Sequence, residues 1–168
     1  MSLKALQVVG YKNAGKTTLV CEIVRRLTTA GLRVGTIKHD AHDADPEPAG
    51  ADTRLHRAAG AHFTAMTSDA RTMWVQERPT TMDDLLSAME EAGVEAVIAE
   101  GFKSARFPKL VLLRGEQDAD LLQLPGIIAV VARTPAFPAD TAIYPVFRTD
   151  HFRFDPLLAF IEEWLLSG

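Results

Sequence analysis

The octapeptide at residues 10–17 constrains this chain more than any other segment. Its sequence, GYKNAGKT, matches the phosphate-binding pattern GxxxxGK[ST] at every fixed position. Gly10 and Gly15 permit backbone conformations that a Cβ would forbid, so the intervening N–H groups can turn inward around a phosphate. Such a loop must follow a buried strand and open a helix, because the helix N-terminus adds its positive dipole to the anion site.

The residues on either side of this loop have the patterns that such a placement requires. The apolar run Ala5–Val9 predicts a buried strand, and Lys16–Ala30 has the spacing of an amphipathic helix that ends at Gly31. Arg33–Lys38 then predicts a second strand. The three segments together predict a βαβ unit with a right-handed crossover.

The rest of the chain continues to alternate between strand and helix patterns. Asp52 and Asp155 are expected to be the N-caps of two helices, and Thr81 with Asp84 resembles the capping box of a third. Further strands are expected at residues 61–67, 72–77, 96–99, 109–113 and 127–132, the first two of them as a hairpin. This alternation predicts an α/β protein with the three-layer P-loop NTPase fold, a mostly parallel sheet and an antiparallel hairpin extension.

Composition limits the class of protein. The chain has 168 residues, of which 47% are hydrophobic and 24% charged, so it is typical of soluble proteins and long enough for one domain. We therefore expect a single P-loop nucleotide-binding domain over residues 1–168. These values exclude a disordered tail, a collagen-like fibre and a disulfide scaffold.

Charge and cysteine content restrict the partners and the compartment. The formal net charge of −4 argues against nucleic acid or an anionic membrane as a general partner. Cys21 is the only cysteine, so no intrachain disulfide can form, which fits a reducing cytosol. No secretory signal is apparent, and no apolar run approaches the ~18 residues that span a bilayer. The expected location is the cytoplasm.

Candidate site residues follow from the chemistry of phosphate and magnesium. Lys16 is predicted to contact the β- and γ-phosphates, and Thr17 to offer its hydroxyl to Mg²⁺. Glu100 follows the apolar run AVIA as a Walker B acid does, and Asp40 follows the second strand. The predicted catalytic residues are Lys16, Asp40 and Glu100, and the predicted metal ligands are Thr17, Asp40 and Glu100. The predicted nucleotide-binding residues are Gly10, Lys12, Asn13, Ala14, Gly15, Lys16, Thr17, Thr18 and Gly101.

Two of these assignments have plain alternatives. Glu100 could be a solvated carboxylate at the end of a strand. Asp40 could be an ordinary acid of the polar loop at residues 39–51, although it could also hold a metal-bound water or orient an attacking one. Apart from Lys16, Lys12 is the loop's only basic residue, so no arginine of the loop can serve as a catalytic finger. Slow hydrolysis at best is therefore expected.

Five motifs in this order resemble the molybdopterin-guanine dinucleotide biosynthesis protein B (MobB) family. They are GYKNAGKTTL at the loop, KHD at 38–40, ADTRLHRAAGA at 51–61, EGFK at 100–103 and PKLVLLR at 108–114. The resemblance implies a small P-loop protein that binds GTP with Mg²⁺ and hydrolyses it weakly. It also implies a homodimer that assists the guanylyltransferase joining GMP to molybdopterin, with molybdopterin itself as a possible ligand.

Other functions remain open from the residues themselves. The sequence has no NKxD motif for guanine, so the preference for GTP over ATP rests on the resemblance. A small-molecule kinase would use the same loop, with arginines on a lid to neutralise the transferring phosphoryl group. The candidates for such a lid are Arg54, Arg57, Arg106 and Arg114, which are not densely clustered. A third hypothesis is an interaction module that holds a nucleotide as a structural ligand.

Overall fold

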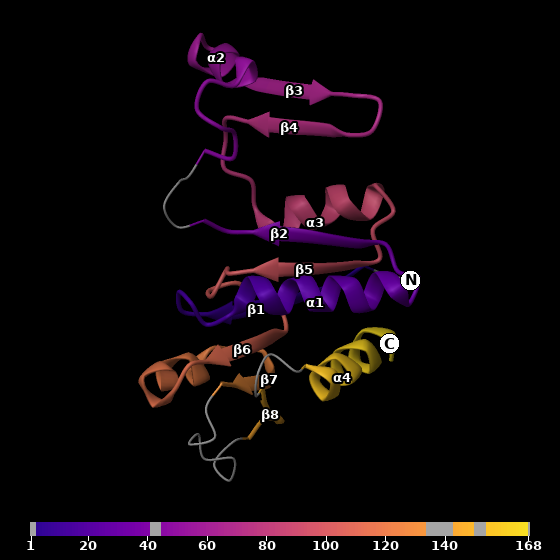
Figure 1. The fold of residues 1–168 in the computed structure, drawn as a ribbon, viewed down its shortest axis with the longest axis vertical. Coiled ribbons are helices and arrows are strands. Elements are labelled where there is room, and N and C mark those ends of the chain that lie inside the picture. The colour runs from indigo at the N-terminus through magenta and orange to yellow at the C-terminus, as the bar shows by residue number, and fades with distance from the viewer. Residues whose placement is uncertain (1–2, 41–44, 134–142, 150–153, 168) are drawn as a thin grey trace. The chain divides into compact units, whose positions relative to one another are not determined.

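The structure, a computed structural model, describes residues 3–40, 45–133, 143–149 and 154–167 (Figure 1). The chain divides into two compact units, one formed by residues 1–39 with 83–168 and the other by residues 40–82.

Among the described residues, no helix has both the length and the apolar character needed to cross a membrane.

The first unit contains a six-stranded sheet in the order β2-β5-β1-β6-β7-β8. Every pairing in it is parallel, and Figure 1 shows the arrowheads of β2, β5 and β6 pointing the same way. The strands β5 and β6 are buried along their whole length, as expected for a parallel sheet covered on both faces. The strands are β1 (Lys4–Gly10), β2 (Val34–Lys38), β5 (Ala96–Glu100), β6 (Lys109–Leu113), β7 (Ile127–Ala132) and β8 (Val146–Arg148).

Helices cover both faces of this sheet. The helices α1 (Lys16–Thr29) and α4 (Asp155–Leu166) pack on the face that includes Val8 of β1. The next residue, Val9, points to the other face, where it packs with residues of the 3₁₀ helix η1 (Glu116–Gln123). Helix α3 (Met82–Glu91) lies on that second face, because its Met89 sulfur is 2.9 Å from the position a Cβ would take on Gly35. The predicted three-layer α/β fold is confirmed.

The second unit contains α2 (Asp52–Ala58) and the antiparallel hairpin of β3 (Phe63–Thr67) and β4 (Thr72–Gln76). The predicted hairpin extension is therefore confirmed. An ionic cluster stabilises the unit, because the Arg57 guanidinium pairs with Asp45, Glu47 and Glu77 at 2.6–2.8 Å. The hydrogen bonds that Arg57 donates to Glu77, and then those to Asp45, raise the pKa of Arg57 above its ordinary value.

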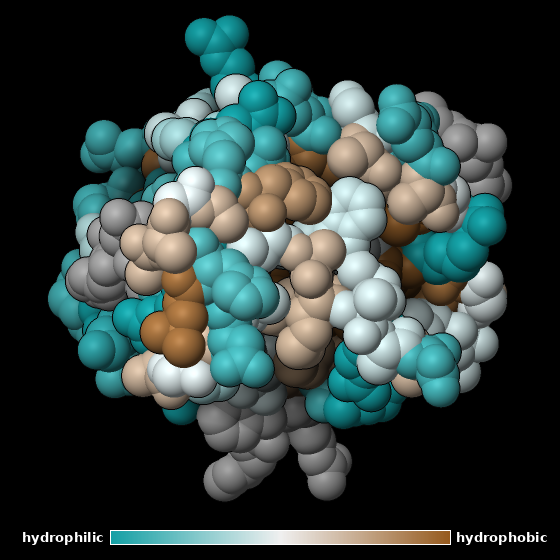
Figure 2. All heavy atoms as spheres, turned by 90° about the horizontal axis from the view of Figure 1, so that it is seen from above, coloured by the Kyte–Doolittle hydropathy of each residue, from teal (hydrophilic) through white to brown (hydrophobic). Residues whose placement is uncertain are grey.

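Large apolar side chains of the second unit are exposed to solvent. Trp74 is 68% exposed, Leu55 60% and Met66 53%. Figure 2 shows hydrophobic residues, in brown, interrupting the hydrophilic surface on the face that it presents. A 43-residue unit with an ionic centre has few places to bury such side chains.

The local predictions were wrong in two respects. Asp52 and Asp155 are the first helical residues and not the N-caps, which are Ala51 and Phe154. A carboxylate in the first turn still favours the helix dipole, which explains why an aspartate stands there. In addition, η1 and β8 were not predicted from the sequence. A 3₁₀ helix lacks the 3.6-residue period, and a strand of three residues is too short to show alternation.

We expect Ile98→Ala to lower the free energy of unfolding by about 2–5 kcal/mol, because Ile98 is completely buried in β5, an interior strand of the sheet. Ile143→Ala is the matched control, since it removes the same atoms from a side chain that is 91% exposed. It should change stability by no more than about 0.5 kcal/mol. Urea unfolding measures both, and equal effects would contradict the described core.

Candidate functional site

The predicted phosphate loop lies at the carboxyl end of β1, which is hydrogen-bonded to β5 on one side and β6 on the other. A Cβ on Gly10 would lie 3.0 Å from the Leu112 carbonyl oxygen and 3.2 Å from the Ala14 Cβ, so a larger residue would have to displace backbone. Asn13 and Gly15 have φ values of 65° and 93°, which places both in the left-handed region. This backbone is the one that the glycine pattern predicts.

Thr17 and Glu100 meet beside this loop. The Thr17 hydroxyl donates to both carboxylate oxygens of Glu100, at 3.1 and 3.0 Å. The contact arises because β1 and β5 are parallel neighbours with Val8 opposite Glu100, so their carboxyl ends lie at the same edge. Glu100 is 9% exposed, which makes it a buried acid and not a solvated one. Two of the three predicted metal ligands are therefore in direct contact.

Lys16 lies across the loop, where one acid and three cations act on its charge. Its Nζ donates to the Tyr11 carbonyl oxygen at 3.0 Å. Burial lowers the pKa of Lys16, the carboxylate of Glu100 raises it, and the positive charges of Lys103, Lys38 and Arg114 lower it again. Lys38 also approaches Glu100, with its Nζ 3.8 Å from the carboxylate. An anion placed here would relieve the repulsion among these groups.

Two arginines that the sequence analysis did not assign to the loop contact its backbone. Arg114 donates to the carbonyl oxygen of Lys12 at 3.2 Å, and Arg133 donates to that of Asn13 at 3.0 Å. Both arginines directly follow apolar strands, β6 and β7, so the strand-end rule that identified Glu100 also applies to them. Because both arginines bind carbonyl oxygens of the loop, they favour a conformation in which the backbone N–H groups point away from the arginines.

Arg114 is itself fixed by the buried acid Asp118. Its guanidinium donates to the carboxylate at 2.8 and 2.6 Å, and its backbone N–H donates at 2.9 Å. Asp118 is completely buried, and the hydrogen bonds from Arg114 lower the pKa of its carboxyl group. The pair forms a rigid support for the loop.

The remaining predicted residues are placed as follows. Lys12, Asn13 and Thr18 are exposed, and Ala14 is buried. Gly101 has a φ of 95°, and its N–H donates to the Val8 carbonyl oxygen at 3.0 Å, so a contact from this N–H to a phosphate would require that bond to open.

Asp40 is exposed and belongs to the second unit, whereas Thr17 and Glu100 belong to the first. The two units are not placed relative to one another, so the role of Asp40 stays a prediction.

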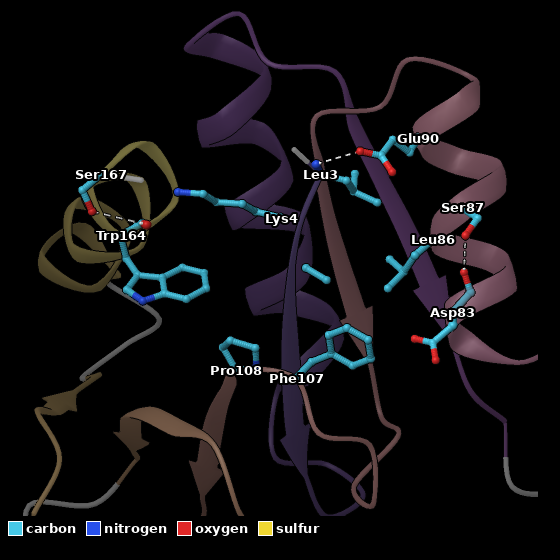
Figure 3. A pocket seen from close by; sticks show the side chains of 11 residues that line it. Leu3, Lys4, Asp83, Leu86, Ser87, Glu90, Phe107, Pro108, Trp164 and Ser167 are labelled. Atoms are coloured by element: carbon cyan, nitrogen blue, oxygen red, sulfur yellow. Dashed lines mark hydrogen bonds between the residues drawn. The ribbon is translucent and has the colours of Figure 1, made fainter. Parts of the chain in front are cut away.

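A cavity of about 490 Å³ adjoins the Thr17–Glu100 pair. It is lined by α1 and β2, with Val24 and Ile37 among its apolar residues. A different cavity, of about 590 Å³, lies near the amino end of β1, where the Lys4 side chain points towards Trp164 and Ser167 and away from α3 (Figure 3). Because it is at the opposite end of β1 from the loop, it has no part in the candidate site.

Comparisons with known proteins agree on one family. The MobB family model, described as molybdopterin guanine dinucleotide synthesis protein B, matches residues 5–133. A probable molybdopterin-guanine dinucleotide biosynthesis adapter protein of Bacillus subtilis is 32% identical over 147 residues, covering 86% of this chain and 85% of the relative. The Escherichia coli adapter protein is 30% identical over 167 residues, covering 95% and 92%. A crystal structure of Bacillus subtilis MobB has a TM-score of 0.83 at 28% identity, covering 98% of this chain and 99% of that one.

We expect Arg114→Met to lower the free energy of unfolding by about 2–3 kcal/mol near pH 7, because it leaves the buried Asp118 carboxylate without a cation. In the parent, the pKa of Asp118 lies below its usual value. The stability that this shift contributes is fully present at pH values above the usual pKa, and it is lost as the pH falls through the lowered pKa. In the variant, burial without a cation raises that pKa. The difference between the two proteins should therefore shrink from pH 7 to about pH 3.

Urea unfolding at both pH values measures this difference. Arg25→Met is the control, since it breaks an exposed pair with Glu22 and should have little effect at either pH. A difference that stays constant, or grows, as the pH is lowered would show that Arg114 does not stabilise an ionised Asp118.

Proposed function

Because this chain belongs to the MobB family, we propose that it is a cytoplasmic GTP-binding adapter protein in the synthesis of the molybdopterin guanine dinucleotide form of the molybdenum cofactor. In this proposal it is at most a weak Mg²⁺-dependent GTPase, it acts as one P-loop domain over residues 1–168, and it works with the guanylyltransferase. Molybdopterin is a possible further ligand. The observation that carries the proposal is the contact of Thr17 with Glu100 beside Lys16 in the phosphate loop.

The charges around Lys16 support a polyphosphate as the ligand. Lys103, Lys38 and Arg114 act on Lys16 together, and Glu100 is the acid that opposes them. A nucleoside triphosphate brings several negative charges to a site whose cations otherwise repel one another. We expect Lys16 to stay charged when the ligand is bound, since phosphate oxygens favour its protonated form.

The Thr17–Glu100 pair fits a magnesium ion. Both side chains present hard oxygen donors, and Mg²⁺ prefers one or two such protein ligands together with waters and phosphate oxygens. When bound, the ion would neutralise charge between the β- and γ-phosphates. Thr17 and Glu100 would hold it, and Asp40 is proposed as a further group that orients water or a metal-bound water. The proposed preference for guanine over adenine rests on the family resemblance and not on a contact with the base.

The arginines favour an adapter over a small-molecule kinase. Arg114 is bound to Asp118, and in the second unit Arg54 and Arg57 are paired with Asp45. Arginines held in this way do not form a mobile lid over a transferring phosphoryl group. Slow hydrolysis is also expected, because these arginines are not available to stabilise the transition state. Binding the ground state tightly does not by itself accelerate the reaction.

The exposed apolar side chains of the second unit support a protein partner. Trp74, Leu55 and Met66 are each more than half exposed, and aromatic residues and methionine are enriched at interfaces. We propose a second copy of this chain as the partner at this surface, in a homodimer. The guanylyltransferase is the proposed partner of the assembled adapter.

A pair of substitutions at Thr17 tests the metal-dependent nucleotide site. Thr17→Val keeps the shape of the side chain but removes the hydroxyl, so GTP affinity should fall about tenfold or more with Mg²⁺ and little in EDTA. Thr17→Ser keeps the hydroxyl and should bind GTP like the parent. Calorimetric titration with and without Mg²⁺ measures both. An equal loss with and without the metal would contradict the proposed role.

A further inference from the structure

The segment at residues 101–108, between β5 and β6, is attached to the sheet by two buried polar side chains. Gln7 Nε2 donates to the carbonyl oxygens of Gly101 and Phe102, at 3.2 and 2.8 Å. Lys109 Nζ donates to those of Ala105 and Phe107. Gln7 and Lys109 are completely buried and stand opposite each other on β1 and β6. The segment is therefore fixed at both ends directly after Glu100.

The backbone turns sharply at the beginning of this segment. Gly101 and Phe102 both have positive φ values, 95° and 56°, and a left-handed conformation is uncommon for phenylalanine. The Phe102 ring lies against His39, with the ring centres 4.9 Å apart. Strained residues of this kind persist where the surrounding structure holds them, often at functional sites. The residue that follows this turn is Lys103.

Lys103 reaches back to the phosphate loop. Its ammonium lies 3.8 Å from the centre of the Tyr11 ring, and Tyr11 is the second residue of the loop. The Tyr11 hydroxyl donates to Asp120 at 2.5 Å, which fixes the ring. The guanidinium of Arg114 also lies over this ring, 5.4 Å from its centre, but an acid and a loop carbonyl hold it. The Lys103 ammonium is closer and rests on the face of the ring.

We propose that Lys103 is a second phosphate-binding cation, which leaves the Tyr11 ring to contact the terminal phosphate of a bound nucleoside triphosphate. This inference rests on the proposed nucleotide-binding function. The exchange is favourable, because a charge-assisted hydrogen bond to a phosphate is stronger than a cation–π contact near the surface. The terminal phosphate is the one concerned, because Thr17 and Glu100 would hold the proposed Mg²⁺ and Lys103 follows Glu100 by three residues.

A comparison of triphosphate with diphosphate binding tests this role. We expect Lys103→Ala to weaken the binding of Mg²⁺–GTP by about tenfold or more and that of Mg²⁺–GDP by less than about twofold. Lys103→Arg should keep most of the parent's preference for GTP over GDP. Lys4→Ala is the control, since it removes a lysine at the opposite end of β1 from the loop and should leave both affinities unchanged. ATP and ADP are titrated in parallel.

Each outcome has a defined meaning. An equal loss for GTP and GDP would show that Lys103 only holds the loop through Tyr11, and it would overturn the inference. Unchanged binding of both nucleotides would also overturn it. If the parent binds ATP in preference to GTP and Lys103→Ala weakens the binding of ATP much more than that of ADP, the inference stands while the guanine part of the proposed function fails. If the parent binds no nucleoside triphosphate, both fail.

Discussion

The hydrogen bonding of β1 between β5 and β6 determines the rest of the candidate site. Parallel pairing brings the carboxyl ends of the three strands to one edge, so the loop after β1 meets Glu100 at the end of β5 and Arg114 after β6. Each of these residues acts on a different part of the loop. Glu100 accepts from Thr17, whereas Arg114 donates to a carbonyl oxygen of the loop backbone. A change in the register of β1 would separate all of these contacts together.

The surroundings of Lys16 disfavour its charged form. Several cations act on Lys16, and the first cause of its lowered pKa is burial, which disfavours the charged form. Glu100 offsets part of this repulsion, and the arginines are directed to backbone carbonyls and, for Arg114, to Asp118. The arrangement resembles other functional sites in which stability is given up to prepare a place for a ligand. A polyanion completes such a site, which supports the proposal of a nucleotide.

Much of this arrangement could be predicted from the sequence, because the pattern GxxxxGK[ST] fixes both a conformation and its place between a strand and a helix. Gly15 has the positive φ that the pattern requires, and Glu100 contacts Thr17 as a strand-end acid should. Tyr11 was not among the predicted nucleotide-binding residues of the loop. The contacts of Lys103 with Tyr11 and of Arg133 with Asn13 could not be predicted, because each joins residues that are far apart in the chain. The N-cap errors at Asp52 and Asp155 have a different origin, since an acid is favoured at both the cap and the first turn.

The central claim is that the loop of residues 10–17 binds Mg²⁺–GTP. Calorimetric titration of the parent with GTP and with ATP, in the presence of Mg²⁺, tests it most directly, with Lys16→Ala as the blank. The account predicts one site per chain that prefers GTP and is lost in Lys16→Ala, while the variant keeps the circular dichroism spectrum and unfolding midpoint of the parent. Binding of GTP that survives in a folded Lys16→Ala variant, or the absence of GTP binding by the parent, would contradict it.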